Sequence, residues 1–202
     1  MSLDIEPPHH PRGGALPRWL EWVTAISALV VSVCSIFIAL RNGEIENRMV
    51  KANSFPYLIG VSSDATPDGA ERISVDFLNN GIGPADEQSL RIRVGGRYVT
   101  SVPDLIATAI GPQDAGPATA SLHWLRNSVP SRFIAAKDNQ FVFRISKTPT
   151  NSAYWDRLDQ TIPTWHIEYC YCSVFEECWA VTNFRHTPVK ACRRDEAHEF
   201  NP

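Results

Sequence analysis

The sequence predicts a mainly β protein: one N-terminal transmembrane helix with a juxtamembrane helical stalk, followed by an immunoglobulin-like β-sandwich. Residues 23–40 are eighteen consecutive positions without a charged side chain. At 1.5 Å rise per residue such a helix is about 27 Å long, close to the thickness of a bilayer's hydrocarbon core. From residue 55 onward, short alternating segments are separated by turn residues every 8–12 positions or so, a spacing typical of β-sandwiches.

The N-terminal elements follow from composition. Residues 1–18 are rich in proline and glycine and lack an apolar pattern, so we expect a disordered leader. The transmembrane helix is predicted over residues 19–40, with Trp19 and Trp22 at one interface and Arg41 at the other, because aromatic and basic side chains anchor spans there. A cleaved secretory signal is the alternative, but the apolar run exceeds the usual length of about 7–15 residues and no small-x-small cleavage site follows it.

Small side chains recur every three or four residues within the predicted span and therefore share one face of the helix. They are Ala25, Ala28, Ser32, Ser35 and Ala39. Small residues let two helix backbones approach closely, so this stripe predicts a dimer interface or a docking face for another membrane protein. A chance alignment of residues that are common in spans is the alternative.

Residues 41–54 are predicted to continue the helix as a stalk. Glu44 and Arg48 form an i,i+4 pair of favourable order, and Pro56 ends the helical pattern. Basic groups are nearly equal in number on the two sides of the span, so the positive-inside rule does not decide its orientation.

Residues 55–192 are predicted to form the β-sandwich domain, and residues 193–202 a flexible tail. Two segments alternate clearly, residues 72–78 and residues 89–94, and the sequence NNGIGP at residues 79–84 is the strongest turn signal between them. A short helical turn is expected over residues 103–110, a further strand over residues 118–126, and a final hairpin about Phe175.

Four cysteines are concentrated near the C-terminus: Cys170, Cys172, Cys178 and Cys192. Folding the last hairpin about Phe175 sets Cys172 opposite Cys178, and Cys192 can then return to Cys170, although three pairings remain possible. Two disulfides would indicate an oxidising compartment. The alternative is a cytosolic zinc site, which a Cys-x-Cys on a flat strand fits poorly because the ligands must surround a tetrahedron.

Composition and motifs exclude several function classes. The net charge is −3 and the isoelectric point is about 6.1, so the composition gives no electrostatic footprint for nucleic acid. No signature of a nucleophile, a phosphate-binding loop or a calcium loop is present. The sequence therefore predicts a protein that is not an enzyme and that uses no cofactor and no metal ion.

Three stretches together resemble an uncharacterised group of bacterial single-pass membrane proteins with an N-terminal anchor and a β-rich C-terminal domain. They are WLEWVTAISALVVSV running to ANSFPYL, NNGIGPA, and CYCSVFEECW. The segment ISVDFLNNGIGPA is also similar to the strand-turn-strand of bacterial immunoglobulin-like adhesion and accessory domains. The resemblance covers most of residues 19–192 and implies architecture only, with no activity and no catalytic residue.

These observations predict a membrane-anchored, non-enzymatic interaction or accessory module at the bacterial inner membrane, with the C-terminal domain in the periplasm. Its partners would be the lipid bilayer and either a second copy of the chain or another membrane or envelope protein. The alternative is a cytosol-facing sensor or effector that depends on zinc or thiol redox chemistry at the four cysteines.

Overall fold

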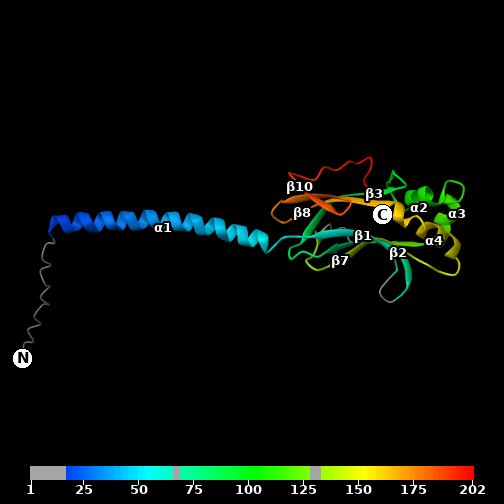
Figure 1. Ribbon diagram of the computed structural model, residues 1–202, viewed down its shortest axis with the longest axis horizontal. Helices are drawn as coiled ribbons and strands as arrows, with labels where there is room; N and C mark the ends of the chain where they lie inside the picture. The colour runs from blue at the N-terminus through cyan, green and yellow to red at the C-terminus, as the bar shows by residue number, and fades with distance from the viewer. Residues whose placement is uncertain (1–16, 66–68, 128–132) are drawn as a thin grey trace, which may run out of the picture. The chain divides into compact units, whose positions relative to one another are not determined.

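The computed structural model describes residues 17–65, 69–127 and 133–202. The predicted leader lies outside these ranges except for its last two residues. The chain divides into two compact units, residues 1–49 and residues 50–202 (Figure 1). The first unit holds most of one long helix, and the second holds all the strands.

Helix α1 (Arg18–Ala52) is 35 residues long and includes, without interruption, the predicted span and residues 41–52 of the stalk predicted over residues 41–54. It is long and apolar enough to cross a membrane, and none of its residues is buried. The hydroxyl groups of Ser32 and Ser35 donate hydrogen bonds to the carbonyl oxygens of Ala28 and Val31, each at 2.8 Å. These hydroxyls are therefore satisfied within the helix, as a lipid environment requires.

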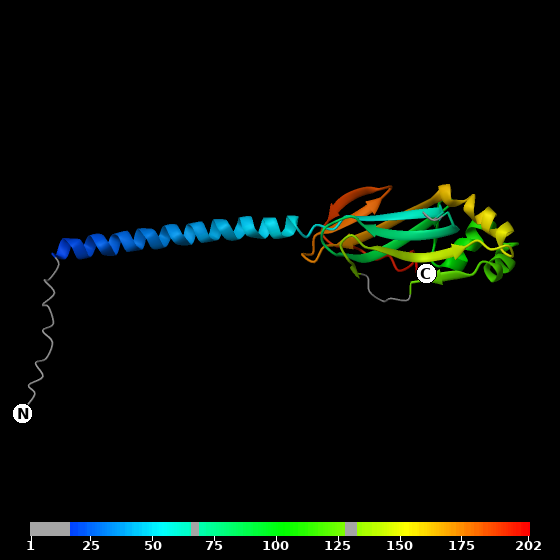
Figure 2. The ribbon, with the colours of Figure 1, turned by 90° about the horizontal axis from the view of Figure 1, so that it is seen from below.

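The C-terminal unit contains two antiparallel sheets whose strands run along its length (Figure 2). The first sheet has the order β1-β2-β7-β5, with β1 (Leu58–Ala65), β2 (Glu71–Asn79), β7 (Asn139–Ser146) and β5 (Trp124–Arg126). The second sheet has the order β10-β9-β8-β3-β4, with β10 (Arg185–Val189), β9 (Cys178–Thr182), β8 (Trp165–Cys172), β3 (Ala85–Val94) and β4 (Arg97–Val99), and β6 (Phe133–Ile134) also pairs with β3.

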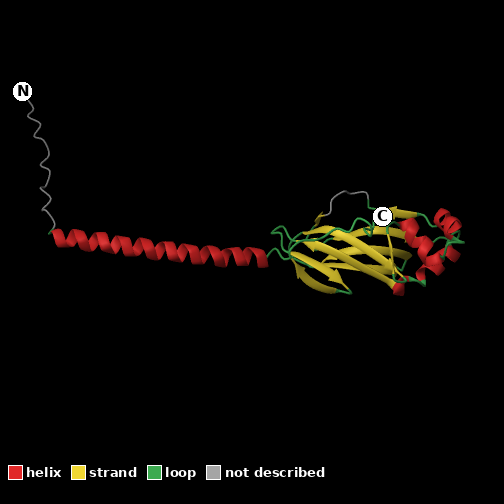
Figure 3. Ribbon diagram, turned by 90° about the horizontal axis from the view of Figure 1, so that it is seen from above, coloured by secondary structure: helices red, strands yellow, loops and turns green. Residues whose placement is uncertain are grey.

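The helices of this unit gather at one end of the sheets (Figure 3). They are α2 (Val102–Ile110), α3 (Ala115–Ser121), α4 (Ser152–Asp159) and the 3₁₀-helix η1 (Ile162–Thr164). Ser101 caps α2 by accepting a hydrogen bond from the backbone N–H of Asp104, and Pro103 stands in its first turn. The predicted helical turn over residues 103–110 is confirmed.

Side chains from both sheets form one hydrophobic core. The alternation predicted for the two clearest strands places the expected residues in it: Ile73, Val75 and Phe77 from β2, and Leu90, Ile92 and Val94 from β3. Phe143 and Ile145 of β7 and the two tyrosines of β8 complete its centre. Period-two hydrophobicity was sufficient here, because each strand buries one face against the opposite sheet.

Tyr169 joins the two sheets through its hydroxyl group. The hydroxyl donates to the carbonyl oxygen of Leu58 at 2.7 Å and accepts from the backbone N–H of Gly60 at 3.0 Å. Both backbone groups belong to β1, which is an edge strand of the first sheet. A Cβ atom at Gly60 would lie 2.9 Å from the Tyr169 ring, so this close approach requires glycine. Burial raises the pKa of Tyr169.

We expect Tyr169→Phe to lower the free energy of unfolding by about 2 kcal/mol, because the change leaves two buried backbone groups without a partner. Urea denaturation of the full-length protein in detergent, followed by tryptophan fluorescence, measures this loss. Tyr154→Phe is a suitable control, since Tyr154 is only partly buried. Equal unfolding midpoints for Tyr169→Phe and the wild type would show that the bridge between the sheets contributes little.

Two predictions for the C-terminal unit were wrong. The strand expected over residues 118–126 is helix α3 followed by the short strand β5. Three alanines among the seven residues of α3 favour a helix locally, and the proline in its first turn is tolerated there. The tail expected to be flexible over residues 193–202 instead packs against the domain, with Glu199 and Phe200 buried.

Candidate functional site on the outer face of the second sheet

The four C-terminal cysteines come together on the outer face of the second sheet. The Sγ atoms of Cys170 and Cys192 are 1.99 Å apart, and those of Cys172 and Cys178 are 2.08 Å apart, so both pairs are at disulfide distance. The register of β8 and β9 places Cys172 directly opposite Cys178. These are the two pairs that the hairpin geometry favoured in the sequence.

The two cystines also contact each other. The Sγ atoms of Cys172 and Cys192, which belong to different cystines, are 3.7 Å apart. The sulfur atoms of Cys172, Cys178 and Cys192 all lie within 4.8 Å of one another. Within the part of the chain that the structure describes, this is the one group of His, Cys, Asp or Glu side chains close enough together to hold a metal ion.

Two pockets open beside the cystines. One, of about 400 Å³, is lined by Cys172, Cys178 and Cys192 together with Asp86, Glu176 and Lys190. The other, of about 580 Å³, is lined by Cys170 and by a basic set of side chains, namely Arg91, Lys190, Arg193 and Arg194, with Asp195 as its carboxylate. Solvent therefore reaches the cystine cluster from two sides.

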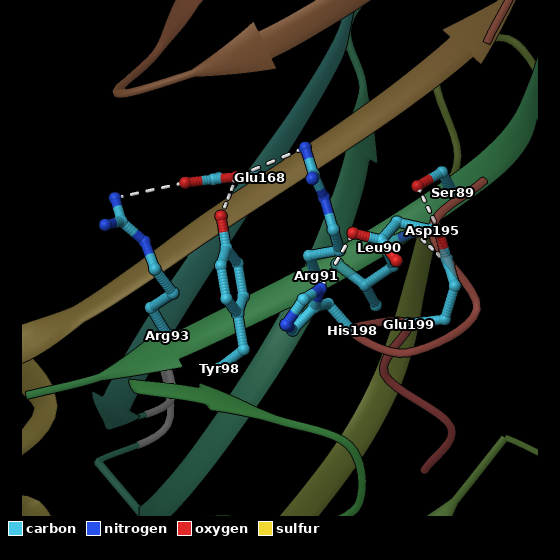
Figure 4. A network of polar contacts seen from close by, with 9 residues as sticks. All are labelled: Ser89, Leu90, Arg91, Arg93, Tyr98, Glu168, Asp195, His198 and Glu199. Carbon is cyan, nitrogen blue, oxygen red and sulfur yellow. Dashed lines mark hydrogen bonds and ion pairs between the residues drawn. The ribbon is translucent and has the colours of Figure 1, made fainter. Parts of the chain in front are cut away.

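Glu168 belongs to β8, as do Cys170 and Cys172. It lies at the centre of a polar network (Figure 4). Its side chain is only 8% exposed. The carboxylate pairs with Arg93 at 3.0 Å and with Arg91 at 3.3 Å, and it accepts a hydrogen bond from the Tyr98 hydroxyl at 3.1 Å. Both guanidinium groups also lie over the Tyr98 ring. Burial, together with the hydrogen bond to Glu168, raises the pKa of Tyr98.

We expect Glu168→Gln to lower the free energy of unfolding by about 1–2 kcal/mol. The amide keeps an acceptor for Tyr98 but removes the charge that neutralises two arginines, and the arginines are partly solvated, which limits the cost. Chemical denaturation of the full-length protein measures the effect. Glu196→Gln, at an exposed carboxylate, should change stability by less than about 0.5 kcal/mol. If Glu168→Gln changes stability no more than the control does, the pairing of Glu168 with the two arginines does not stabilise the domain.

The C-terminal tail crosses this face after Cys192. Asp195 accepts a hydrogen bond from His198 at 2.7 Å, and this bond lowers the pKa of Asp195. The His198 ring packs on Tyr98 with the ring centroids 4.7 Å apart. The tail therefore covers the same tyrosine that the arginines contact (Figure 4).

The last residues fill a gap in the hydrogen bonding of β3, between its pairings with β6 and β4. Glu199 accepts hydrogen bonds from the Ser89 hydroxyl at 2.6 Å and from the backbone N–H of Leu90 at 3.1 Å. The N–H of Phe200 donates to the Leu90 carbonyl oxygen at 2.8 Å, and that of Asn201 to Thr100 at 2.9 Å. The end of the chain thus lies beside β3 (Figure 1).

The other residues singled out in the sequence belong to the N-terminal unit. The five residues of the small-residue stripe are all exposed on α1. Trp19 and Trp22 are exposed as well, and the Arg41 guanidinium lies over the Phe37 ring. The fifth cysteine, Cys34, is a free and exposed thiol in this helix.

Sequence reasoning missed the Glu168 network and the docking of the tail. Arg91 and Arg93 alternate along residues 89–94 and therefore share one face of β3, but the carboxylate that meets them comes from a strand some 75 residues later. An aromatic residue in the terminal sequence HEFNP was the only local sign that the tail packs.

This arrangement offers thiol–disulfide chemistry at the cystines and ionic contacts at the basic pocket. A search against protein-family models, curated proteins and solved structures finds no match to this chain.

Proposed function

We propose that this chain is a single-pass protein of the bacterial inner membrane whose C-terminal domain faces the periplasm. The domain would be an immunoglobulin-like β-sandwich that acts as a non-enzymatic interaction module. The observation that carries the proposal is the cysteine arrangement: all four cysteines of the domain are at disulfide distance. Paired cysteines are typical of exported domains, and the helix that precedes this domain can anchor it.

The partner that best fits the helix is a second copy of the chain. The small-residue stripe lies on one exposed side of α1, and the hydroxyls of Ser32 and Ser35 are bonded to the helix's own backbone. Such a surface permits close packing of two helices without leaving a polar group unpaired.

Sidedness is tested with reporters fused after Pro202. A reporter enzyme that needs disulfide bonds to become active should be active in this fusion, whereas a reporter that fluoresces only in the cytosol should be dark. The reverse pair of results would place the domain in the cytosol and would refute the proposal.

Self-association is tested with Ser32→Leu, which adds a bulky side chain on the stripe. We expect the association constant of the dimer to fall by about tenfold, because a misfit costing about 1.4 kcal/mol changes an association constant tenfold. Sedimentation equilibrium in detergent measures the mass. Ser27→Leu is the matched control, since Ser27 also bonds within the helix but lies off the stripe. A wild-type chain that is monomeric would contradict the helix interface.

A second function, a cytosol-facing sensor that uses zinc or thiol redox chemistry, is favoured by one observation. The sulfur atoms of Cys172 and Cys192, which belong to different cystines, are 3.7 Å apart, and sulfur ligands of a tetrahedral zinc ion are about 3.8 Å apart. Metal analysis of protein purified under reducing conditions separates the two functions. About one zinc ion per chain would support the sensor, and none would support the exported module.

A further inference from the structure

We propose that the two cystines form a single thiol–disulfide exchange site, in which Cys192 changes its partner from Cys170 to Cys172 when a small thiol opens the Cys172–Cys178 bond. This assigns a reaction to the domain beyond its role as an interaction module. The substrate class is a low-molecular-weight thiol.

The distances between sulfur atoms carry the inference. The Cys172 and Cys192 sulfurs are 3.7 Å apart, in contact although they belong to different cystines. Exchange begins when a thiolate meets a disulfide sulfur, so here the attacking atom and its target are already adjacent. Cys172 lies in the hairpin of β8 and β9, and Cys192 lies in the tail. The bond can therefore transfer from Cys170 to Cys172 while β8 and β9 stay paired.

Access to the cluster supports a small thiol as the reactant. The pocket of about 400 Å³ is lined by Cys172, Cys178 and Cys192, and its volume is within the usual range of small-molecule sites, about 300–1,000 Å³. Cys170 and Cys178 are each 7% exposed, but Cys178 lines this pocket and Cys170 does not. The pocket is thus lined by both cysteines of the Cys172–Cys178 bond and by only one cysteine of the Cys170–Cys192 bond, which favours attack on the former.

The reaction balances in three exchanges. A thiolate attacks Cys178, forms a mixed disulfide with it, and releases Cys172 as a thiolate. The Cys172 thiolate attacks Cys192, forms the Cys172–Cys192 bond, and releases Cys170 as a thiolate, which takes a proton from water. A second thiolate then attacks the sulfur of the thiol bound to Cys178, forms the external disulfide, and releases Cys178 as a thiolate, which takes a proton from water. Overall, two thiols become one external disulfide and the protein gains two thiol groups.

The first test is partial reduction of the full-length chain in detergent with reduced glutathione, followed by alkylation and peptide mapping. We expect a one-disulfide intermediate that contains the Cys172–Cys192 bond, with Cys170 and Cys178 alkylated. Its formation should accelerate about tenfold per pH unit below a thiol pKa of about 8.5, because the thiolate is the reactive form. Intermediates that contain only Cys170–Cys192 or only Cys172–Cys178 would overturn the proposal.

The second test needs no added thiol. In a Cys34→Ser background, Cys178→Ser leaves Cys172 as a free thiol against the Cys170–Cys192 bond. Alkylation should then label both Cys172 and Cys170, because the bond transfers between them. The double variant Cys172→Ser/Cys178→Ser is the matched control and should show no label at Cys170. Label at Cys172 alone would refute the exchange.

These outcomes are independent of membrane sidedness, since both tests use the purified chain. If Cys178→Ser does not fold, the glutathione experiment on the wild-type sequence decides the matter alone. A domain that proves to face the cytosol would defeat the proposed function and leave the exchange result unchanged.

Discussion

Replacing Phe200 with alanine is expected to lower the free energy of unfolding of the C-terminal domain by about 3–5 kcal/mol, the usual cost of truncating a buried aromatic side chain. Phe200 is 4% exposed and belongs to the core that both sheets form. Its ring centroid lies 5.8 Å from that of Phe143 in β7. The third residue from the C-terminus is thus a core residue, and its loss also leaves a cavity between the sheets.

Chemical denaturation of the full-length protein in detergent measures this effect through the shift of the unfolding midpoint. Phe184→Ala is the matched control, because Phe184 is 73% exposed and its loss should change stability by less than about 0.5 kcal/mol. Equal effects of the two substitutions would show that the tail does not contribute to the core.

Removing the Cys170–Cys192 bond with the double variant Cys170→Ala/Cys192→Ala is expected to cost about 3 kcal/mol in stability, against about 2 kcal/mol for Cys172→Ala/Cys178→Ala. The difference between the two stability costs follows from the lengths of the loops that the two bonds close. The first pair is separated by 22 residues and the second by 6, so the first restricts the unfolded chain more. The first bond also fastens the tail whose end carries Phe200.

Thermal and urea unfolding of the two double variants, each against the wild type under non-reducing conditions, gives the two costs. The denaturant slope is fitted separately for each variant, because the loss of a crosslink lets the unfolded chain expand and expose more surface. A larger cost for Cys172→Ala/Cys178→Ala than for the other pair would contradict the loop argument.

Local sequence patterns were sufficient to predict much of the fold. The alternation of Ile73, Val75 and Phe77 identified a strand and its buried face, since period two is set by the backbone of the strand itself. The pairing of Cys172 with Cys178 could also be predicted from the sequence, because a short hairpin fixes which residues face each other. The long apolar helix was identified from length and charge alone.

Contacts between distant segments could not be predicted in the same way. The Tyr169 hydroxyl donates to the Leu58 carbonyl oxygen of β1, in the opposite sheet. No local pattern around Tyr169 or Leu58 in the sequence predicts that hydrogen bond. Glu168 and its two arginines meet only because β3 and β8 are neighbours in the sheet order, which the sequence did not specify. The tail looked flexible because half of its ten residues are charged, and its buried residues are few.

The most direct test of the proposed membrane-anchored, exported domain is cysteine labelling of intact cells with a membrane-impermeant maleimide, before and after an impermeant reductant. We predict that the domain takes no label before reduction and is labelled at Cys170, Cys172, Cys178 and Cys192 afterwards, in protein recovered from the membrane fraction. Labelling of these cysteines only after lysis, without any reductant, would contradict both the oxidised state and the exported position of the domain.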